Sequence, residues 1–355
     1  MRGSDYYLIS TEDREEWLEI IERAEQLDIA FHPDYLRSLE CLDQEKSAFG
    51  GRGRLFVYDS GEGTAICPFM LKSLSGLDPR WRGDDISSPY GYSGPVWISP
   101  RRLDRPICEG FRNAFDDFCT DQGIVTEFYR PNPFLQRCDS GGDGTMIDHG
   151  PMVYIDLVQD METIHRDFKK NCRQSINKAT RSGVTIRASP KDGADIREFT
   201  KIYDETMKRS QAETDYYFPE EFYRRLAAME ESTLLLAEHE GQVVSALWLL
   251  AYGNSAHAFL GGTNVEGRNL NAFYLILAEA ISRSKLSGWR VFCFGGGHGH
   301  RDGVLDFKLS FSRTTAPFRT FRKVHDLAMY EDVCTATGVS SDLDQYFPPY
   351  RGVGR

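Results

Sequence analysis

Patterns that would assign a class at once are missing from this chain. Its eight cysteines include no C-x-x-C pair, which argues against a zinc ribbon or a disulfide framework, so we expect reduced and mostly buried thiols. No stretch approaches about 18 uninterrupted apolar residues, and the first residues carry charges where a signal peptide would be apolar. These absences favour a soluble, cytoplasmic protein.

The chain also has fewer cationic than anionic side chains. The chain has 42 Lys and Arg residues against 53 Asp and Glu residues, a net charge of −11. Cations that neutralise phosphates supply sequence-independent affinity for nucleic acid, so any polyanion must meet a local basic patch. There is likewise no G-x-S-x-G, Walker or H-E-x-x-H motif. We predict neither a metal nor a bound cofactor; a donor such as aminoacyl-tRNA or acyl-CoA would be a co-substrate.

What the chain does contain is a repeated order of elements. Its 355 residues, 41% of them apolar, are enough for two domains. Hydrophobic spacing in the first half predicts a helix, two strands, a helix and a strand, over residues 10–27, 55–58, 65–71, 103–119 and 124–129. The second half predicts three helices, a three-stranded meander, a helix and a strand, over residues 161–182, 195–211, 219–229, 233–239, 243–252, 256–261, 271–286 and from 289. We therefore predict an α+β protein with two domains of one type.

The segment from Trp289 to Phe311 indicates a site. It reads WRVFCFGGGHGHRDGVLDFKLSF, an apolar strand that stops at glycines and restarts as an amphipathic helix with Phe307 and Lys308. A lysine near a helix start is electrostatically unfavourable unless an anion lies opposite, because that end of the helix is partly positive. The alternative is a surface lysine whose stem covers Phe311.

The helix predicted over residues 161–182 concentrates cations. Against one neighbouring acid, Asp167, it carries Arg166, Lys169, Lys170, Arg173, Lys178 and Arg181. One interpretation is an ordinary solvated face. The other is an electropositive stripe for a phosphate-bearing ligand.

Three stretches together resemble one known family. They are the Phe307-Lys308 pair after the glycines, FKKNCRQSINKATRSGVTIR from Phe168, and SSPYGYSGP from Ser87. In this order they are similar to stretches of the Fem-type (FemABX) peptidoglycan-bridge aminoacyltransferases and their GNAT-like relatives.

The resemblance implies two tandem GNAT-like domains, the fold of acyl-CoA N-acyltransferases. Residues 1–150 would form the first domain and residues 151–315 the second, which would carry the donor site. Residues 316–355 would pack back on the first domain.

The resemblance also implies roles for single residues. Lys308 would stabilise charge during aminoacyl transfer, with Phe307 as its aromatic neighbour. The general base would be Asp306, Asp302 or a group of the substrate.

Substrate contacts are implied at several further positions. Arg209 lies in a T-x-x-R arrangement similar to one that helps to hold acceptor phosphates, and an aromatic loop follows it. The other candidates for substrate binding are Tyr216, Tyr217, Tyr90, Tyr92, Lys169, Lys170, Arg173, His298 and His300. The alternatives are a cation at a helix end, core tyrosines, and a loop that covers the first domain. The two histidines alternate with Asp302, yet three ligands in one loop rarely complete a metal's coordination shell, so we expect hydrogen bonds there and no metal.

Two departures bear on the donor. CoA-dependent GNAT enzymes bind pyrophosphate with a Gly-rich loop, of which NVEGRNLNAF keeps only Gly267 and Arg268. The helical arm with which some Fem-type proteins bind tRNA has no counterpart after Gly241.

The leading hypothesis is an N-acyltransferase (EC 2.3) that joins an aminoacyl group from aminoacyl-tRNA to an amine of a peptidoglycan-precursor-like or nucleotide-sugar-linked peptide. The alternatives are an acyl-CoA or acyl-carrier-dependent GNAT enzyme of envelope polysaccharide or secondary metabolism, and a non-catalytic GNAT-like scaffold.

Overall fold

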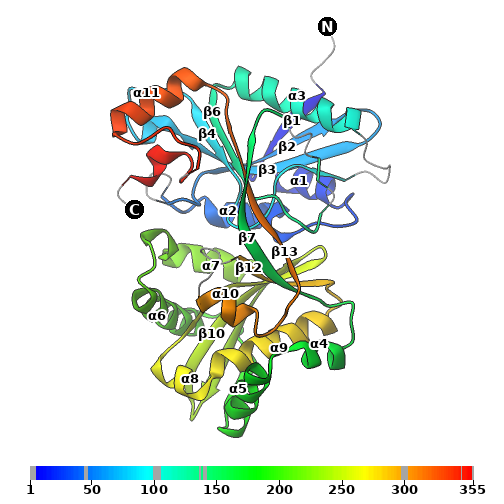
Figure 1. The fold of residues 1–355 in the computed structure, drawn as a ribbon, viewed down its shortest axis with the longest axis vertical. Helices are drawn as coiled ribbons and strands as arrows, with labels where there is room; N and C mark the ends of the chain where they lie inside the picture. The colour runs from blue at the N-terminus through cyan, green and yellow to red at the C-terminus, as the bar shows by residue number, and fades with distance from the viewer. Residues whose placement is uncertain are drawn as a thin grey trace. The chain divides into compact units, whose positions relative to one another are not determined.

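The chain forms two compact units (Figure 1). The computed structural model describes residues 5–43, 47–98, 105–135, 137–138, 142–296, 303–344 and 346–353. Unit 1 comprises Met1–His149 and Phe318–Arg355, and unit 2 comprises Gly150–Pro317. Among the described residues, no helix has the length and apolarity needed to cross a membrane.

Unit 1 is built on a mixed sheet with the strand order β1-β2-β3-β4-β6-β13, and β5 also pairs with β3. The strands are β1 (Tyr6–Ser10), β2 (Arg52–Asp59), β3 (Thr64–Ser73), β4 (Asp84–Ser87), β5 (Val96–Trp97), β6 (Ile124–Tyr129) and β13 (Thr315–Val324). The helices are α1 (Arg14–Ile21), α2 (Pro33–Leu39), α3 (Arg105–Asp121) and α11 (Leu327–Thr337), with short 3-10 turns η1 (Ile29–Phe31), η2 (Leu74–Gly76) and η4 (Pro349–Gly352).

An aromatic core joins α3 to the sheet of unit 1. Phe111, Phe115 and Phe118 follow the helical spacing that puts side chains on one face, and all three rings lie within 6 Å of Phe56 on β2. Edge-on and stacked pairs of this kind add to the free energy of simple burial.

The segment after unit 2 is anchored to unit 1 by a buried ion pair. Arg351 of η4 donates from Nε to Asp85 of β4 at 2.6 Å, and both side chains are at most 5% exposed. Tyr350 and Thr126 donate to the other carboxylate oxygen at 2.7 and 2.6 Å. Such a carboxylate is stable only while its partners remain, because an unpaired buried charge is costly.

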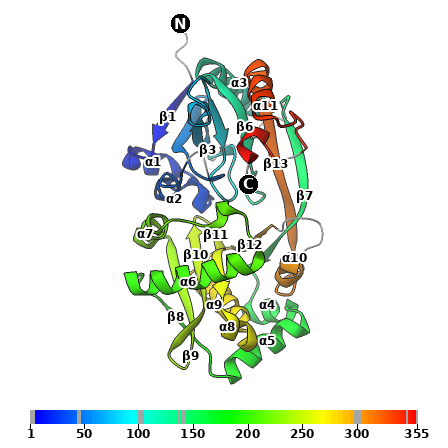
Figure 2. The ribbon, with the colours of Figure 1, turned by 90° about the vertical axis from the view of Figure 1, so that its left-hand side faces the viewer.

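Unit 2 is built on a sheet with the order β7-β12-β11-β10-β9-β8 (Figure 2). The strands are β7 (Thr145–Asp156), which begins in unit 1, β8 (Thr185–Ala188), β9 (Ser232–His239), β10 (Gln242–Tyr252), β11 (Ser255–Thr263) and β12 (Val291–Gly296). The helices are α4 (Met161–Asp167), α5 (Lys170–Arg181), α6 (Gly193–Ser210), α7 (Glu220–Ala228), α8 (Val265–Leu270), α9 (Ala272–Leu286) and α10 (Gly303–Lys308), with a 3-10 turn η3 (Thr214–Tyr216).

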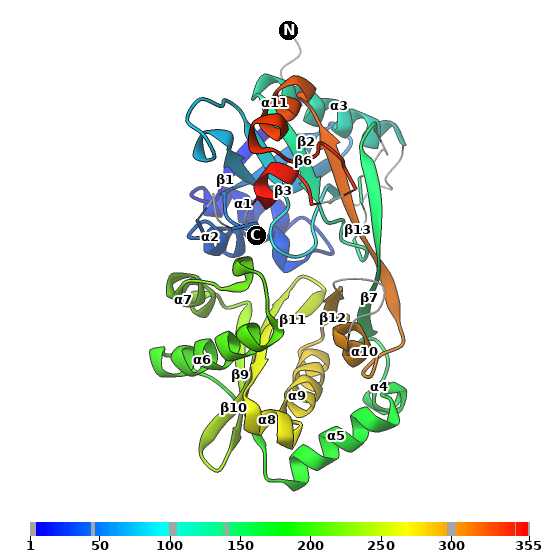
Figure 3. The same cartoon turned by 60° about the vertical axis from the view of Figure 1, so that its left-hand side comes forward.

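Helices cover both faces of this sheet, α6 on one face and α9 on the other (Figure 3). Two successive glycines of β11 permit close approach on both sides. A Cβ at Gly261 would lie 2.7 Å from the ring of Phe273 on α9, and one at Gly262 would lie 2.9 Å from the Ile202 carbonyl oxygen of α6. Neither position leaves room for a side chain.

The prediction of one helix over residues 161–182 was wrong, because the structure has α4 and α5 with a break at Phe168. There the backbone is extended (ψ 136°), and the ring packs on Phe311 at 5.3 Å. Arg173 donates to the carbonyl oxygens of Arg166 and Phe168 at 2.8 and 2.6 Å, which satisfies acceptors that the end of α4 leaves free.

Smaller differences lie at other elements. The helix expected from residue 10 begins at Arg14, because Ser10 still belongs to β1. The sequence did not indicate the short strands β1, β4 and β5, the long strands β7 and β13, or the helices α2, α8 and α11. All eight cysteines are thiols outside any disulfide, and seven are buried, as expected.

We predict that Arg351→Ala destabilises the protein by about 3–5 kcal/mol, because it leaves the Asp85 carboxylate buried without its cation. Urea unfolding at pH 7 measures the change. Arg80→Ala is the matched control, since Arg80 pairs with Asp78 at an exposed position where an ion pair contributes about 0–1 kcal/mol. Equal effects of the two substitutions would contradict the assignment of Arg351 as an anchor.

Candidate functional site

The sheet of unit 2 opens between β11 and β12. These parallel strands pair over only three residues, the last being His257 opposite Cys293, although both strands continue. Just beyond, each has an extra residue relative to its antiparallel neighbour: Phe259 in β11 against β10, and Phe294 in β12 against β7. A β-bulge bends its strand and increases the twist. The two strands therefore separate, and this edge of β11 has no strand partner among the described residues.

Lys308 brings a cation to the opening. It ends α10, and its Nζ donates to the carbonyl oxygens of Gly295 and Gly296, the last residues of β12, at 3.2 and 2.5 Å. The argument that Lys308 lies near a helix start was wrong, since the partly negative end of a helix favours a cation. The position is what distinguishes this lysine: a half-buried ammonium at the end of a strand that borders the opening.

Phe307 and Asp306 point to different environments. The Phe307 ring lies 4.9 Å from the ring of Tyr274 and 5.6 Å from that of Phe311, in the aromatic layer beneath Lys308. Asp306 is exposed and makes no hydrogen bond or ion pair with another described residue. Of the possible bases, Asp302 lies outside the described residues, as do His298 and His300.

The start of α5 lies beside the end of α10. The backbone N–H of Lys169 donates to the carbonyl oxygen of Ser310 at 2.8 Å. Lys169 is half-buried, Lys170 is exposed, and the first turn of α5 has neither an acidic residue nor a side-chain cap. Cations at the positive end of a helix repel one another and the helix dipole, and a bound anion would relieve that repulsion.

The other cations of α4 and α5 contact uncharged groups or solvent in the described part of the chain. None of the six basic residues from Arg166 to Arg181 pairs with an acid among the described residues. Lys178 donates instead to the carbonyl oxygen of Asn269 at 2.7 Å, and Arg181 is exposed. This basic stripe is a net positive surface in an acidic protein.

Arg209 is held at the end of β11. Its Nη1 donates to the carbonyl oxygen of Thr263 at 3.1 Å, while the Thr263 N–H donates to the Thr206 hydroxyl at 3.0 Å. The T-x-x-R arrangement thus ties α6 to the part of β11 that β12 does not reach. Burial, together with the positive charge of Arg268, lowers the pKa of Arg209. The two arginines are therefore close enough to repel each other.

The connection from β11 to α9 passes through α8. A Cβ at Gly267 would lie 2.2 Å from the Val244 carbonyl oxygen and 2.5 Å from the Thr263 hydroxyl. This glycine therefore serves the packing of α8 on the sheet. Asn271 then adopts a left-handed backbone (φ 58°) before α9 begins. A packed helix stands where a Gly-rich phosphate loop would be needed.

The candidate tyrosines belong to both units. In unit 2, Tyr216 lies in η3 and Tyr217 follows it with 36% exposure. In unit 1, the Tyr90 carbonyl oxygen accepts from the Tyr35 hydroxyl at 2.5 Å, and the half-buried Tyr92 meets Phe318 edge-on at 5.8 Å. The loop from Ser87 to Pro95 is thus fixed to the body of unit 1.

Among its described residues, unit 1 has no opening of the kind found in unit 2. Its parallel strands β4 and β6 stay bonded past their ends: Ser88 donates to the Phe128 carbonyl oxygen and Ser93 to that of Arg130, each at 2.8 Å. The same two-strand arrangement is closed in one unit and open in the other. The opening therefore distinguishes unit 2 from unit 1.

A buried cluster in unit 1 has the composition of a metal site. Asp116, Glu127 and His325 bring ligand atoms within 4.8 Å of one another. Arg112 already contacts both carboxylates, at 2.7 and 2.9 Å, and Lys323 contacts Asp116 at 2.9 Å. These cations occupy oxygens that a metal would need, so the cluster is better described as an ion-pair network.

Sequence reasoning missed several residues around the opening. Tyr274 underlies Phe307, the carbonyl groups of Gly295 and Gly296 hold Lys308, and Ser310 meets the start of α5. The glycines ending the strand were the available signal for the contact with Lys308. No local pattern marks backbone contacts between distant segments.

Comparisons with known proteins agree with this geometry. Residues 166–308 match the family model of the acetyltransferase (GNAT) domain. The matched residues include β11, β12 and α10. No curated protein matches the sequence.

Solved structures share the fold across nearly the whole chain at low identity. FemX superposes with a TM-score of 0.69 at 11% identity, covering 92% of this chain and 98% of that one. The C-terminal domain of an Agrobacterium fabrum protein described as a lysylphosphatidylglycerol synthetase gives 0.57 at 13% identity, covering 95% and 100%. A tandem GNAT protein from the clavulanic acid pathway gives 0.51 at 10% identity, covering 90% and 98%.

Residues 166–308 of unit 2 thus match a GNAT domain, and they contain the opening between β11 and β12. The two units of the chain share the fold of the tandem GNAT protein, and FemX superposes over nearly the same length of the chain. The predicted fold class is confirmed.

We predict that the ion-pair network of unit 1 makes stability depend on pH in the acid range. Burial opposes ionisation of Glu127, but Arg112 and His325 more than offset it, so the pKa of Glu127 lies below its usual value. A carboxyl whose pKa is lower in the folded state stabilises the fold above its unfolded pKa of about 4.3, and this contribution is lost as pH falls through the folded pKa.

Glu127→Gln should therefore be several kcal/mol less stable than the wild type at pH 7, and the difference should shrink below about pH 4. Urea unfolding between pH 7 and pH 3 measures both. Glu198→Gln, at an exposed position of α6, should show no such change. A difference that stays constant with pH would contradict the assignment.

Proposed function

We propose that this protein transfers an aminoacyl group from an aminoacyl-tRNA to the amine of a peptidoglycan-precursor-like or related peptide. The observation that carries the proposal is the position of Lys308, a cation held by two strand-end carbonyl groups where β11 and β12 separate. The GNAT-domain match and the tandem fold support acyl transfer in general. The donor and the acceptor are inferred from charge and from the resemblance to Fem-type enzymes.

Aminolysis of an aminoacyl ester requires that the two substrates are positioned together and that the developing negative charge is stabilised. The acceptor nitrogen attacks the ester carbonyl carbon, negative charge develops on the carbonyl oxygen, and the bond from carbon to the ribose oxygen breaks. The nitrogen loses one proton and the ribose oxygen gains one, so the reaction is balanced without a covalent enzyme intermediate. Lys308 would stabilise the negative oxygen. Burial raises the pKa of the nearby Cys172 thiol to about 11, which makes it a poor nucleophile at neutral pH.

The basic stripe of α4 and α5 supports a polyanionic donor. Its cations have no acidic partners among the described residues, and the start of α5 is bonded to the segment that follows Lys308. A tRNA backbone along this stripe would bring its esterified end toward the opening. The same surface in a protein with a net charge of −11 would give the chain a local attraction for phosphates.

The pair of arginines near the end of β11 supports an acceptor with phosphates. Arg209 and Arg268 repel each other, and an anion between them would remove that repulsion. A guanidinium suits this role because its planar donors match phosphate oxygens. Tyr216 and Tyr217 follow α6 and would contact the rest of the acceptor.

A second candidate is an acyl-CoA-dependent N-acyltransferase. The unpaired edge of β11 favours it, because an extended amide-containing chain such as pantetheine can add to a strand edge. The packing of Gly267 against Val244 and Thr263 disfavours it, since the backbone there serves the protein and not a pyrophosphate. Calorimetry with acetyl-CoA separates the two candidates: a micromolar dissociation constant would place the CoA-dependent enzyme first.

We predict that Lys308→Ala lowers single-turnover amide formation by about 100-fold to 1,000-fold, the usual effect of removing one donor to a developing oxyanion. The melting temperature should change by only a few degrees, because Lys308 is not in the core. Lys285→Ala is the control, since its Nζ makes only a long contact to the Val158 carbonyl oxygen at 3.5 Å. Unchanged turnover in Lys308→Ala would remove this lysine from the site.

We predict that binding of aminoacyl-tRNA weakens steeply with salt and that Lys170→Ala and Arg181→Ala each reduce the slope. Each phosphate contact contributes roughly 0.7–0.9 to the slope of log K against log salt concentration, so each substitution should remove about that amount. Filter binding between 50 and 200 mM salt measures it, with Arg290→Ala, an exposed cation elsewhere in unit 2, as the control. Slopes that do not respond to the stripe would refute the tRNA donor.

A further inference from the structure

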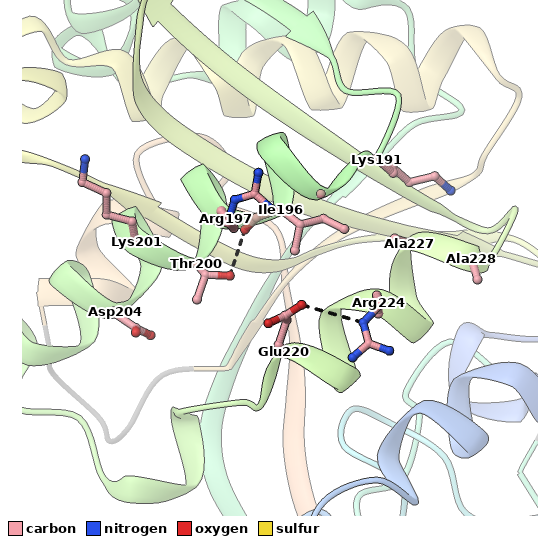
Figure 4. Close-up of a pocket in the computed structure, with 11 residues that line it drawn as sticks. Lys191, Ile196, Arg197, Thr200, Lys201, Asp204, Glu220, Arg224, Ala227 and Ala228 are labelled. Atoms are coloured by element: carbon pink, nitrogen blue, oxygen red, sulfur yellow. Dashed lines mark hydrogen bonds and ion pairs between the residues drawn. The ribbon is translucent and has the colours of Figure 1, made fainter.

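A groove lies between α6 and α7 of unit 2 (Figure 4). Its volume is about 660 Å³, within the range of about 300–1,000 Å³ that is typical of small-molecule sites. It belongs to the α6 face of the sheet, whereas α9 covers the other face. The groove therefore takes no part in the arrangement around Lys308.

The packing of the two helices explains why a groove forms. On the side toward the sheet, the bulky rings of Phe199 and Tyr223 meet edge-on with centroids 5.3 Å apart. On the outer side the facing positions are small, at Gly193, Ala227 and Ala228. Large residues inside and small residues outside leave a channel between the helix backbones. The buried Ile196 side chain adds to its apolar floor.

One cation is fixed at an end of the groove. The Nζ of Lys191 donates to the carbonyl oxygens of Met229 and Ser232 at 2.6 and 3.1 Å. The Lys191 backbone adopts the left-handed conformation (φ 60°), which is uncommon for a residue with a side chain and marks a position held by its surroundings. The ammonium is therefore pre-positioned.

Two further cations, Arg197 and Lys201, lie one helical turn apart on α6. Both are exposed, and neither forms an ion pair with another described residue. Arg224 on α7 does have partners, at 2.6 Å from Glu221 and 3.8 Å from Glu220. In Figure 4, Glu220 and Arg224 are joined across one turn of α7.

The net positive charge of the residues that line the groove favours an anionic ligand. The groove is lined by four cations and two acids, the acids being Asp204 and Glu220, which leaves a net charge of +2 (4 − 2). With Glu220 near Arg224, the unpaired positive charge lies on the α6 side. An anion beside Arg197 and Lys201 could lay an apolar body over Ile196 and the two alanines.

We propose that this groove is a second ligand site, which binds an organic anion with a compact apolar body. The site is independent of the proposed acyl transfer. The anionic group would contact Arg197 and Lys201, whose donors suit phosphate or carboxylate oxygens. The apolar body would cover the floor formed by Ile196, Ala227 and Ala228.

Isothermal titration calorimetry on the full chain tests the site with three probes. Phenyl phosphate carries both features, inorganic phosphate only the charge, and benzyl alcohol only the apolar ring. We expect phenyl phosphate to bind at least tenfold more tightly than either of the others. Equal binding of inorganic phosphate would mean an adventitious ion only, and absence of phenyl phosphate binding would overturn the proposal.

Substitutions locate the binding. Ala228 is exposed at the end of α7, so either long side chain is compatible with folding. Ala228→Glu should weaken phenyl phosphate binding at least tenfold, while Ala228→Lys should preserve it. Joint replacement of Arg197 and Lys201 by alanine should also weaken it tenfold. The same loss of charge at Lys285 and Arg290 should have no effect. Binding that ignores Ala228→Glu would place the ligand elsewhere and refute the site.

Discussion

The constraint on which the site depends is that β11 and β12 cannot stay paired. Each strand gains one residue, Phe259 or Phe294, against the neighbour on its other side, so the two lose register with each other after His257 and Cys293. A sheet interrupted in this way keeps its hydrophobic layers and still exposes backbone groups at one place. Lys308 and the basic start of α5 are arranged around that interruption. In unit 1, the corresponding strands remain bonded to their ends, and the cation there, Arg130, donates to the Ser88 hydroxyl at 3.3 Å.

The buried charges of unit 1 have a structural role. Asp85 is contacted by Arg351 and by two hydroxyl groups, and Glu127 by Arg112 and His325; these partners come from segments far apart in the sequence. Pairs of this kind add little net stability compared with apolar packing, but removing one member is costly. They therefore specify which segments belong together. Asp85 joins β4 to η4, and Glu127 joins β6 to α3 and the segment after β13.

The sequence allowed the order of elements to be predicted because hydrophobic periodicity is local. The strand expected over residues 124–129 has those bounds in the structure, and two tandem GNAT-like units were inferred correctly. The site was harder. Phe168 ends a helix because its ring packs on Phe311, a contact between residues distant in sequence. The bulges at Phe259 and Phe294 depend on register between strands, for which no residue pattern is diagnostic. Lys308 was chosen both for its expected place near a helix start, which the structure overturned, and for its resemblance to the Fem-type lysine, which stays a prediction.

The path of the chain has a consequence for synthesis. Unit 2 is a continuous segment, Gly150–Pro317, whereas unit 1 takes its final strand, α11 and η4 from residues after Phe318. On the ribosome, unit 2 can complete its hydrogen-bonded sheet while Asp85 still lacks Arg351. Domains generally fold as units during elongation, beginning with the segments made first. Here the segment made first cannot complete its fold until the last segment has been translated. Until then the sheet of unit 1 lacks β13 and exposes surface that a chaperone could cover.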